Sequence, residues 1–117
     1  MAREFSRSER VASLLQRELA VLLQSYQEDL NLGLVTISAV ELTRDIAVAT
    51  VYVTVLGVEG DVLTEHLERL QHSASFLRKE LGRALRLRVV PELRFKYDDS
   101  IDTGMRMDKI LKDLDNA

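Results

Sequence analysis

The sequence predicts a two-layer α+β domain with helices on one face of a three-stranded sheet. Three observations support this prediction. Apolar residues recur at helical spacing over 6–26 and 61–85, β-branched residues fill two segments within 34–56, and apolar and polar residues alternate over 87–97. With 117 residues, 30% of them charged, the chain suits one domain with a single modest core.

The first helix is predicted over residues 6–26. Its start matches a capping box, because the Ser6 hydroxyl and the Glu9 carboxylate can each satisfy an amide left unpaired at a helix start. Acids and bases are mixed on its polar side, which favours core packing over membrane binding. The apolar side carries Val11, Leu14, Leu15, Leu19, Leu22, Leu23 and Tyr26.

Two strands follow, over 34–42 and 46–56. The polar turn Thr43-Arg44-Asp45 between them suits an antiparallel hairpin. In the second strand the odd-numbered residues from 47 to 55 are all apolar, so this side should face the core. The G-x-x-G at 57–60 precedes the next helix and contains Glu59, which would repel phosphate, so it is interpreted as a loop.

Periodicity then predicts one long helix over 61–85, with Asp61 as its N-cap. Ser73-Ala74-Ser75 is the weak point of this helix, because serine hydroxyls compete for backbone hydrogen bonds. Its apolar stripe consists of Leu63, Leu67, Leu70, Ala74, Leu77, Leu81 and Leu85.

The last strand is predicted over 87–97, with apolar odd positions and mostly basic even positions. Pro91 cannot donate a ladder hydrogen bond, so we expect an edge strand, or Pro91 at a bulge or at the strand start. Residues 1–97 would form the domain. Residues 98–117 would form an acidic tail. This tail is expected to be either partly helical over 107–114 or partly disordered.

Positive charge gathers in one segment of an acidic chain. The formal net charge is −3, yet seven bases face two acids between residues 78 and 96. Lys79, Arg83 and Arg86 are spaced by four and three, opposite the apolar stripe. We predict that these bases and those of the last strand form one ridge that contacts RNA phosphates, although basic runs are also common on solvated faces. The predicted RNA-binding residues are Arg78, Lys79, Arg83, Arg86, Arg88, Arg94 and Lys96.

No set of residues points to catalysis or a cofactor. The chain has no cysteine, and His66 and His72 are six apart, on different helix faces. Asp98, Asp99 and Asp102 could gather a magnesium ion, but a solvated strand exit explains them better. The start of the chain is charged and no apolar run reaches roughly 20 residues, so the sequence predicts no signal peptide and no membrane helix. We therefore expect a cytosolic protein.

The stretch RLRVVPELRFKYDDSIDTGMRM, residues 86–107, resembles the signature of the bacterial ribosome-binding factor A family. The resemblance implies a type II KH-like domain with a mixed sheet and a kink between two central helices. It further implies a cytoplasmic, non-enzymatic factor that binds the immature small ribosomal subunit and its rRNA and assists late maturation, notably in the cold. The family's kink has the pattern Ala-x-Gly, and Ser73, Ala74 and Ser75 occupy those positions here.

Two other functions stay open at this point. The exposed edge strand and the basic ridge could recruit an acidic protein partner. A hydrolase or nuclease that uses Asp98, Asp99 and Asp102 ranks far behind. We expect a monomer, and the family resemblance suggests assembly GTPases as further partners.

Overall fold

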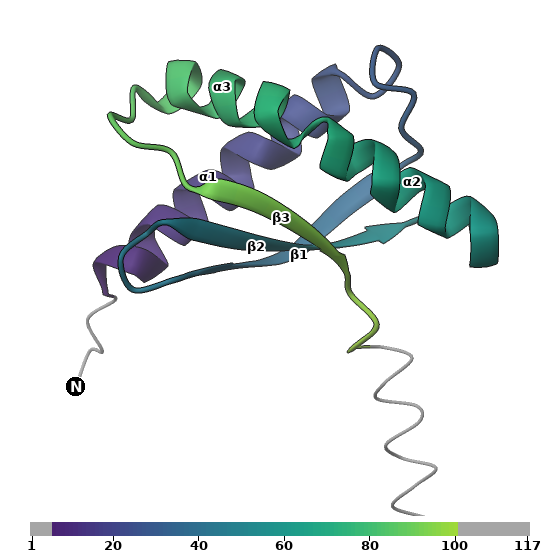
Figure 1. The fold of residues 1–117 in the computed structure, drawn as a ribbon, viewed down its shortest axis with the longest axis horizontal. Coiled ribbons are helices and arrows are strands. Elements are labelled where there is room, and N and C mark those ends of the chain that lie inside the picture. Colours follow the sequence, from purple (N-terminus) through teal and green to yellow (C-terminus); the bar gives the residue numbers. More distant parts are fainter. Residues whose placement is uncertain (1–5, 101–117) are drawn as a thin grey trace, which may run out of the picture.

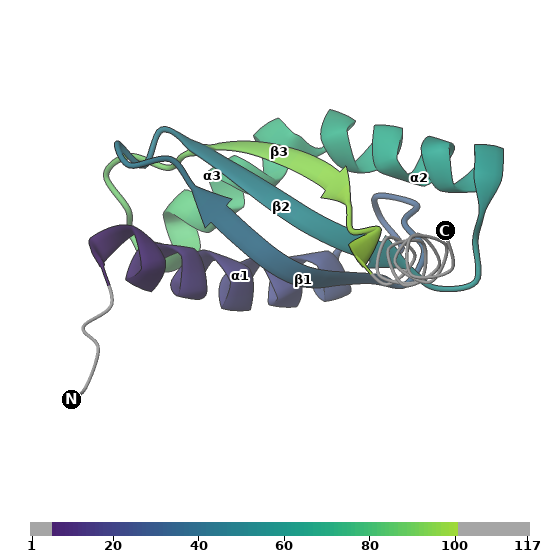
Figure 2. The same ribbon diagram turned by 90° about the horizontal axis from the view of Figure 1, so that it is seen from below.

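The computed structural model describes residues 6–100, which form three helices on one face of a three-stranded sheet (Figures 1 and 2). This arrangement confirms the predicted α+β architecture and the order of its elements. Most of the predicted tail, from residue 101 onward, lies outside the described residues. The elements in chain order are α1 (Arg7–Ser25), β1 (Val35–Leu42), β2 (Val48–Val55), α2 (Gly60–His72), α3 (Ala74–Leu85) and β3 (Glu92–Tyr97).

Helix α1 begins at the predicted cap. Ser6 is extended, with φ −65° and ψ 163°, and its Oγ accepts a hydrogen bond from the Glu9 amide at 3.2 Å. Leu14 is an exception to the predicted apolar face, because it is 48% exposed on the outer side of the helix. The buried residues of α1 are Leu15, Leu19, Leu22 and Leu23.

The sheet is mixed. Its order is β1-β2-β3, with β1 and β2 antiparallel and β2 and β3 parallel. The predicted inner side of β2 is confirmed, because alternate residues from Ala49 to Val55 are buried. The core below the helices therefore rests on β2, the central strand.

The predicted start of the second strand at Ile46 is wrong, because β2 begins at Val48. Ile46 still belongs to the turn: its φ is +59°, and its amide donates to the Thr43 carbonyl at 2.9 Å. The Thr43 Oγ1 also accepts from the amides of Ala47 and Val48, both at 3.1 Å. The threonine hydroxyl thus accepts hydrogen bonds from amides that would pair with the opposite strand in a longer hairpin.

The predicted weak point in the long helix is a real break. Ser73 is the one residue between α2 and α3, at φ −84° and ψ −4°, and its Oγ donates to the Arg69 carbonyl at 2.9 Å. Ala74 and Ser75 already belong to α3. The break therefore needs no residue at positive φ, a conformation that serine disfavours.

The prediction of Asp61 as N-cap is wrong. The cap position of α2 is Glu59, which makes no side-chain capping hydrogen bond, and the helix starts at Gly60. Asp61 lies within the first turn, where its negative charge still favours the positive end of the helix dipole.

The last strand is shorter than predicted, because β3 begins at Glu92, directly after the buried Pro91. Its edge position and the proline at its start are confirmed. Residues 87–90 form an irregular connection in which Val89 is 71% exposed. Alternation fails there because Arg86, at φ +52°, ends α3 in a left-handed conformation and turns the chain away.

The core lies between the helices and the inner side of the sheet. Within residues 6–100, no helix has the length and apolar character that crossing a membrane requires. The largest fully buried aliphatic side chains are Leu15, Leu19, Leu70, Leu77, Leu81, Leu93, Val51 and Val53.

Candidate nucleic-acid interface

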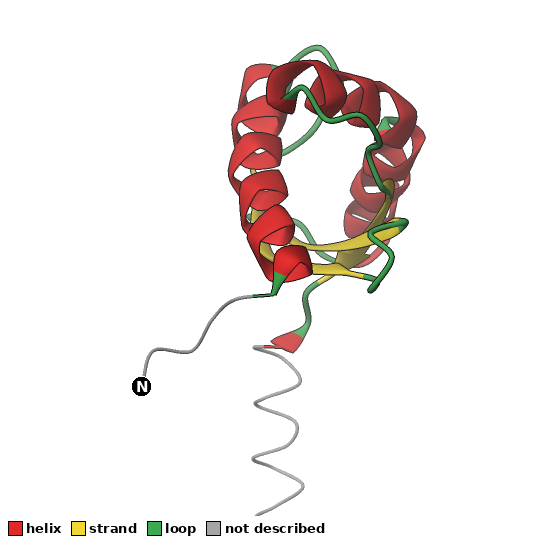
Figure 3. Ribbon diagram, turned by 90° about the vertical axis from the view of Figure 1, so that its left-hand side faces the viewer, coloured by secondary structure: helices red, strands yellow, loops and turns green. Residues whose placement is uncertain are grey.

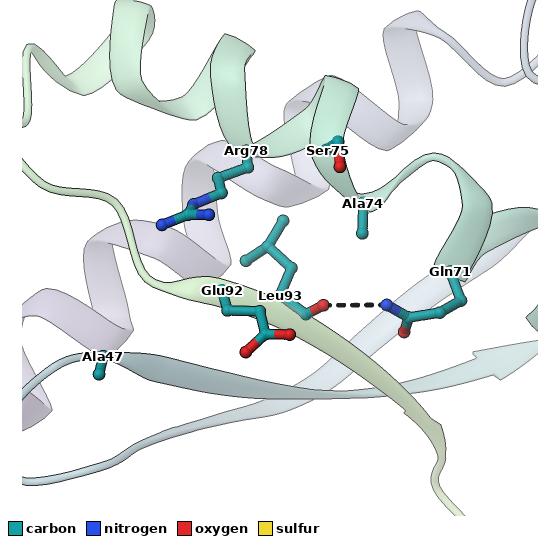
Figure 4. A pocket seen from close by; sticks show the side chains of 7 residues that line it. All are labelled: Ala47, Gln71, Ala74, Ser75, Arg78, Glu92 and Leu93. Atoms are coloured by element: carbon teal, nitrogen blue, oxygen red, sulfur yellow. Dashed lines mark hydrogen bonds between the residues drawn. The ribbon is translucent and has the colours of Figure 1, made fainter.

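A groove follows the flank of α3 that faces the start of β3. It consists of two adjoining hollows of about 410 Å³ and about 350 Å³, which share Ser75 and Arg78. The groove therefore begins at the break between α2 and α3 and continues past Val90. The first hollow is drawn in Figure 4 and is lined by Ala47, Gln71, Ala74, Ser75, Arg78, Glu92 and Leu93.

Gln71 ties α2 to the free edge of β3 at one end of this groove. Its Nε2 donates to the Leu93 carbonyl at 3.1 Å, the contact drawn in Figure 4, and its Oε1 accepts from the Phe95 amide at 2.9 Å. Backbone groups of alternate residues in β3 point away from β2, so a side-chain amide takes the place of a neighbouring strand. Gln71 is not among the predicted site residues, because no periodicity in the sequence distinguishes it.

We expect Gln71→Ala to lower the free energy of unfolding by about 1 to 2 kcal/mol, because it removes two hydrogen bonds that the side chain makes to the backbone of β3. Urea unfolding followed by circular dichroism would measure the change. Gln24→Ala, the same substitution at an exposed position of α1, is the matched control and should cost under about 0.5 kcal/mol. Equal losses for the two variants would contradict the role assigned to Gln71.

Arg78 fixes the connection between α3 and β3. Its Nε and Nη2 both donate to the Val90 carbonyl, at 3.0 Å and 2.8 Å. Part of its donor set is therefore used inside the domain, although the side chain remains exposed and lines both hollows. Arg78 thus holds the Val90 wall of the groove in place, and the other N–H groups of its guanidinium remain available to solvent.

The outer side of α3 carries Lys79 and Arg83, and the C-cap that follows carries Arg86; we call these three residues the α3 stripe. All three residues are exposed, opposite the buried Leu77 and Leu81. Arg83 Nη1 is 3.5 Å from Glu80 Oε1, but the arginine side chain is 67% exposed. Such exposed ion pairs are weak, so the charge stays available to an external anion.

The prediction of one continuous ridge is wrong, because Arg94 and Lys96 lie on the opposite side of the sheet. Leu93 and Phe95 pack against the core below the helices, and strand alternation turns their neighbours to the open face. Arg94 Nη2 is also 3.3 Å from Glu92 Oε2. The fold thus separates the predicted bases into two groups, one along α3 and one on the open face of the sheet, where Arg94 is paired with Glu92.

Two hydrogen-bonded groups share this open face. The Tyr52 hydroxyl donates to Glu41 Oε2 at 3.4 Å, and the nearby carboxylate raises the pKa of the Tyr52 phenol. Hydrogen bonds from Ser38 and then Ser100 lower the pKa of Asp98. Asp98 therefore stays ionised, and its Oδ1 accepts a hydrogen bond from the Ser100 amide at 2.9 Å, directly after β3.

The residues considered for a metal site are not brought together within the described part of the chain. No group of three His, Cys, Asp or Glu side chains in residues 6–100 is placed to hold a metal ion. His66 is half-buried with Nδ1 2.8 Å from the Val62 carbonyl, while His72 is exposed. Asp99 is exposed, and Asp102 lies outside the described residues.

The chain is similar to known proteins over most of its length. A family model described as Ribosome-binding factor A matches residues 7–111. A curated protein of that name from Hahella chejuensis is 46% identical over an aligned length of 117 residues. The match covers 96% of this chain and 87% of the relative.

Solved structures show the same relationship. The crystal structure of ribosome-binding factor A from Thermus thermophilus aligns with a TM-score of 0.65 and 29% identity, and the match covers 79% of this chain and 97% of that chain. A homology model of the Thermus thermophilus factor, fitted into a cryo-EM map of its complex with the 30S subunit, aligns with a TM-score of 0.62 and 31% identity. That match covers 75% of this chain and 91% of the other.

Proposed function

The chain belongs to the ribosome-binding factor A family, whose structures have a KH-like fold, and from this premise we propose that it binds the immature small ribosomal subunit through its rRNA. In this proposal it assists late maturation and rRNA processing, notably in the cold, and catalyses no reaction. Cooperation with assembly GTPases, which the family resemblance suggests, a monomeric state and a cytoplasmic location are part of the same proposal.

The observation that carries the proposal is the exposed α3 stripe beside the α3 groove. Lys79 and Arg83 lie one helical turn apart, and Arg86 directly follows the helix as its C-cap, so the three cations can contact neighbouring phosphates of an RNA strand; each contact releases condensed counterions. Arginine also pairs with phosphate oxygens through two parallel donors. We therefore assign the main RNA contacts to Lys79, Arg83 and Arg86, with Arg78 and Arg88 at their margins and Arg94 and Lys96 as a separate surface.

The proposed recognition is of RNA shape and backbone rather than of bases. Phe76 packs edge-on against Tyr26, with ring centroids 4.8 Å apart, and Phe95 and Tyr97 are half-buried. These rings are poorly placed for bases to stack on them. The kink residues Ser73, Ala74 and Ser75 would instead allow an RNA backbone to approach the groove, since Ala74 and Ser75 line it.

The experiment is co-sedimentation of the purified protein with free small subunits and with intact ribosomes in sucrose gradients. We expect migration with free small subunits, and an apparent binding constant whose logarithm falls linearly with the logarithm of salt concentration between about 50 and 200 mM. Failure to migrate with small subunits, or binding that does not respond to salt, would overturn the proposal.

The structure disfavours the alternative of a protein-interaction module built on β3. An edge strand recruits another chain through free backbone groups. Gln71 already occupies the Leu93 carbonyl and the Phe95 amide, which are two such groups of β3. A partner strand would have to displace this contact first.

A further inference from the structure

Three arginines that are far apart in the sequence surround one hollow at the end of the molecule that Figure 3 turns toward the viewer. The hollow measures about 850 Å³ and lies between the start of α1, the β1–β2 turn and the α3–β3 connection. Figures 1 and 2 also place these three segments side by side. Each segment contributes one arginine, namely Arg7, Arg44 and Arg88, which together define the arginine hollow.

The charge of the arginine hollow is positive and open to solvent. All three arginines are exposed, and within residues 6–100 no carboxylate forms an ion pair with any of them. Among the described residues Asp45 is the one acid that lines the hollow, and its Oδ1 accepts from Thr43 Oγ1 at 2.7 Å and from the Ala47 amide at 3.2 Å. These bonds lower the pKa of Asp45, so it stays ionised and contributes one negative charge beside the three arginines.

The backbone around the arginine hollow is held in place. Arg7 follows the capping residue of α1, and Arg88 lies in the connection that Arg78 fixes through the Val90 carbonyl. Arg44 lies in the turn that ends at Ile46, whose φ of +59° is rare for a β-branched residue. Strain of this kind persists where the surroundings dictate it, and it is concentrated at binding sites.

The arginine hollow and the α3 groove meet the same connection between α3 and β3. The groove is lined by Val90, and the hollow is lined by Arg88 and Val89, which directly precede it in the chain. An RNA strand that lies along α3 would reach the hollow by crossing this connection. The exposed Val89 would lie against its sugars, while the guanidinium groups face the phosphates.

We propose that Arg7, Arg44 and Arg88 form a second binding site for the RNA phosphate backbone, at the end of the domain next to the α3 groove. This inference depends on the proposed function and extends it to two residues that the charge distribution along the chain did not indicate. Guanidinium groups on three converging segments suit the successive phosphates of a nucleic-acid strand.

The test compares R7Q/R44Q with R10Q/R17Q, a pair on α1 outside the arginine hollow that removes the same net charge. Binding of free small subunits and of a uridine 12-mer RNA would be measured across salt concentrations. We expect R7Q/R44Q to weaken binding about tenfold and to reduce the salt slope by about 1.4, as two lost phosphate contacts predict for a single strand. R10Q/R17Q should stay within about twofold of the unmodified protein.

The outcomes separate the two proposals. If the unmodified protein does not bind small subunits, the proposed function fails. If it binds, but R7Q/R44Q matches it or R10Q/R17Q loses as much, the arginine hollow is not an RNA site. Competition by inorganic phosphate at low millimolar concentration would instead indicate a site for the free anion and would also overturn the inference. Should R7Q/R44Q fail to fold, Arg44→Gln in the exposed turn provides the same test, with an expected loss of about threefold.

Discussion

Reversing the charges of the α3 stripe, in K79E/R83E/R86E, is expected to weaken binding to free small ribosomal subunits about 10³-fold. Each substitution removes one phosphate contact and adds a repelling charge, so a loss of roughly 1 to 1.5 kcal/mol per position is expected. The three side chains are exposed and outside the core, so the fold should survive. Sedimentation across a salt series would measure the affinity, and circular dichroism the fold.

Two controls separate this effect from a general change in net charge. The neutral variant K79Q/R83Q/R86Q should bind with an affinity between those of the unmodified and the reversed protein, since it loses contacts without adding repulsion. R10E/R17E reverses charge on the outer side of α1 and should reduce binding much less. If K79E/R83E/R86E binds within threefold of the unmodified protein, the α3 stripe is not the RNA surface.

Leu77→Ala is expected to cause the largest loss of stability. Leu77 is 0% exposed and lies on the inner side of α3, below the α3 stripe. Removing its branched end loses apolar burial and leaves a cavity, which costs about 3 kcal/mol in well-packed cores. For a domain of this size the melting temperature should fall by about 12 to 20 °C, measurable by calorimetry.

The matched control is Leu14→Ala, which removes the same atoms from a leucine that is 48% exposed. Its expected cost is below about 1 kcal/mol, because little burial is lost and no closed cavity forms. If the two variants melt at the same temperature, the packing of α3 against the sheet does not stabilise the domain as the structure indicates. Below its melting temperature Leu77→Ala should still bind small subunits, because the α3 stripe is unchanged.

Local signals explain which elements could be predicted. The Ser6 cap, the spacing of leucines in α1 and the alternation in β2 are all properties of neighbouring residues, and these predictions are confirmed apart from the exposed Leu14. The errors lie at boundaries. The β-branched residues around Ile46 predict a strand, but the hydrogen bonds of Thr43 keep Ile46 in the turn. Residue type favours Asp61 as a cap, although the helix starts before it.

The α+β fold, the core faces of α1 and β2, the family and the α3 stripe were all predictable from the amino-acid order, because each depends on periodicity or on a contiguous motif. Three features became known only from the folded chain: Arg94 and Lys96 lie on the opposite side of the sheet, Gln71 covers part of the edge of β3, and Arg7, Arg44 and Arg88 line one hollow. Charge counted along a chain does not reveal which face of a strand or which side of a turn a residue will occupy. Packing of distant segments sets those directions, and with them the surfaces that an RNA could contact.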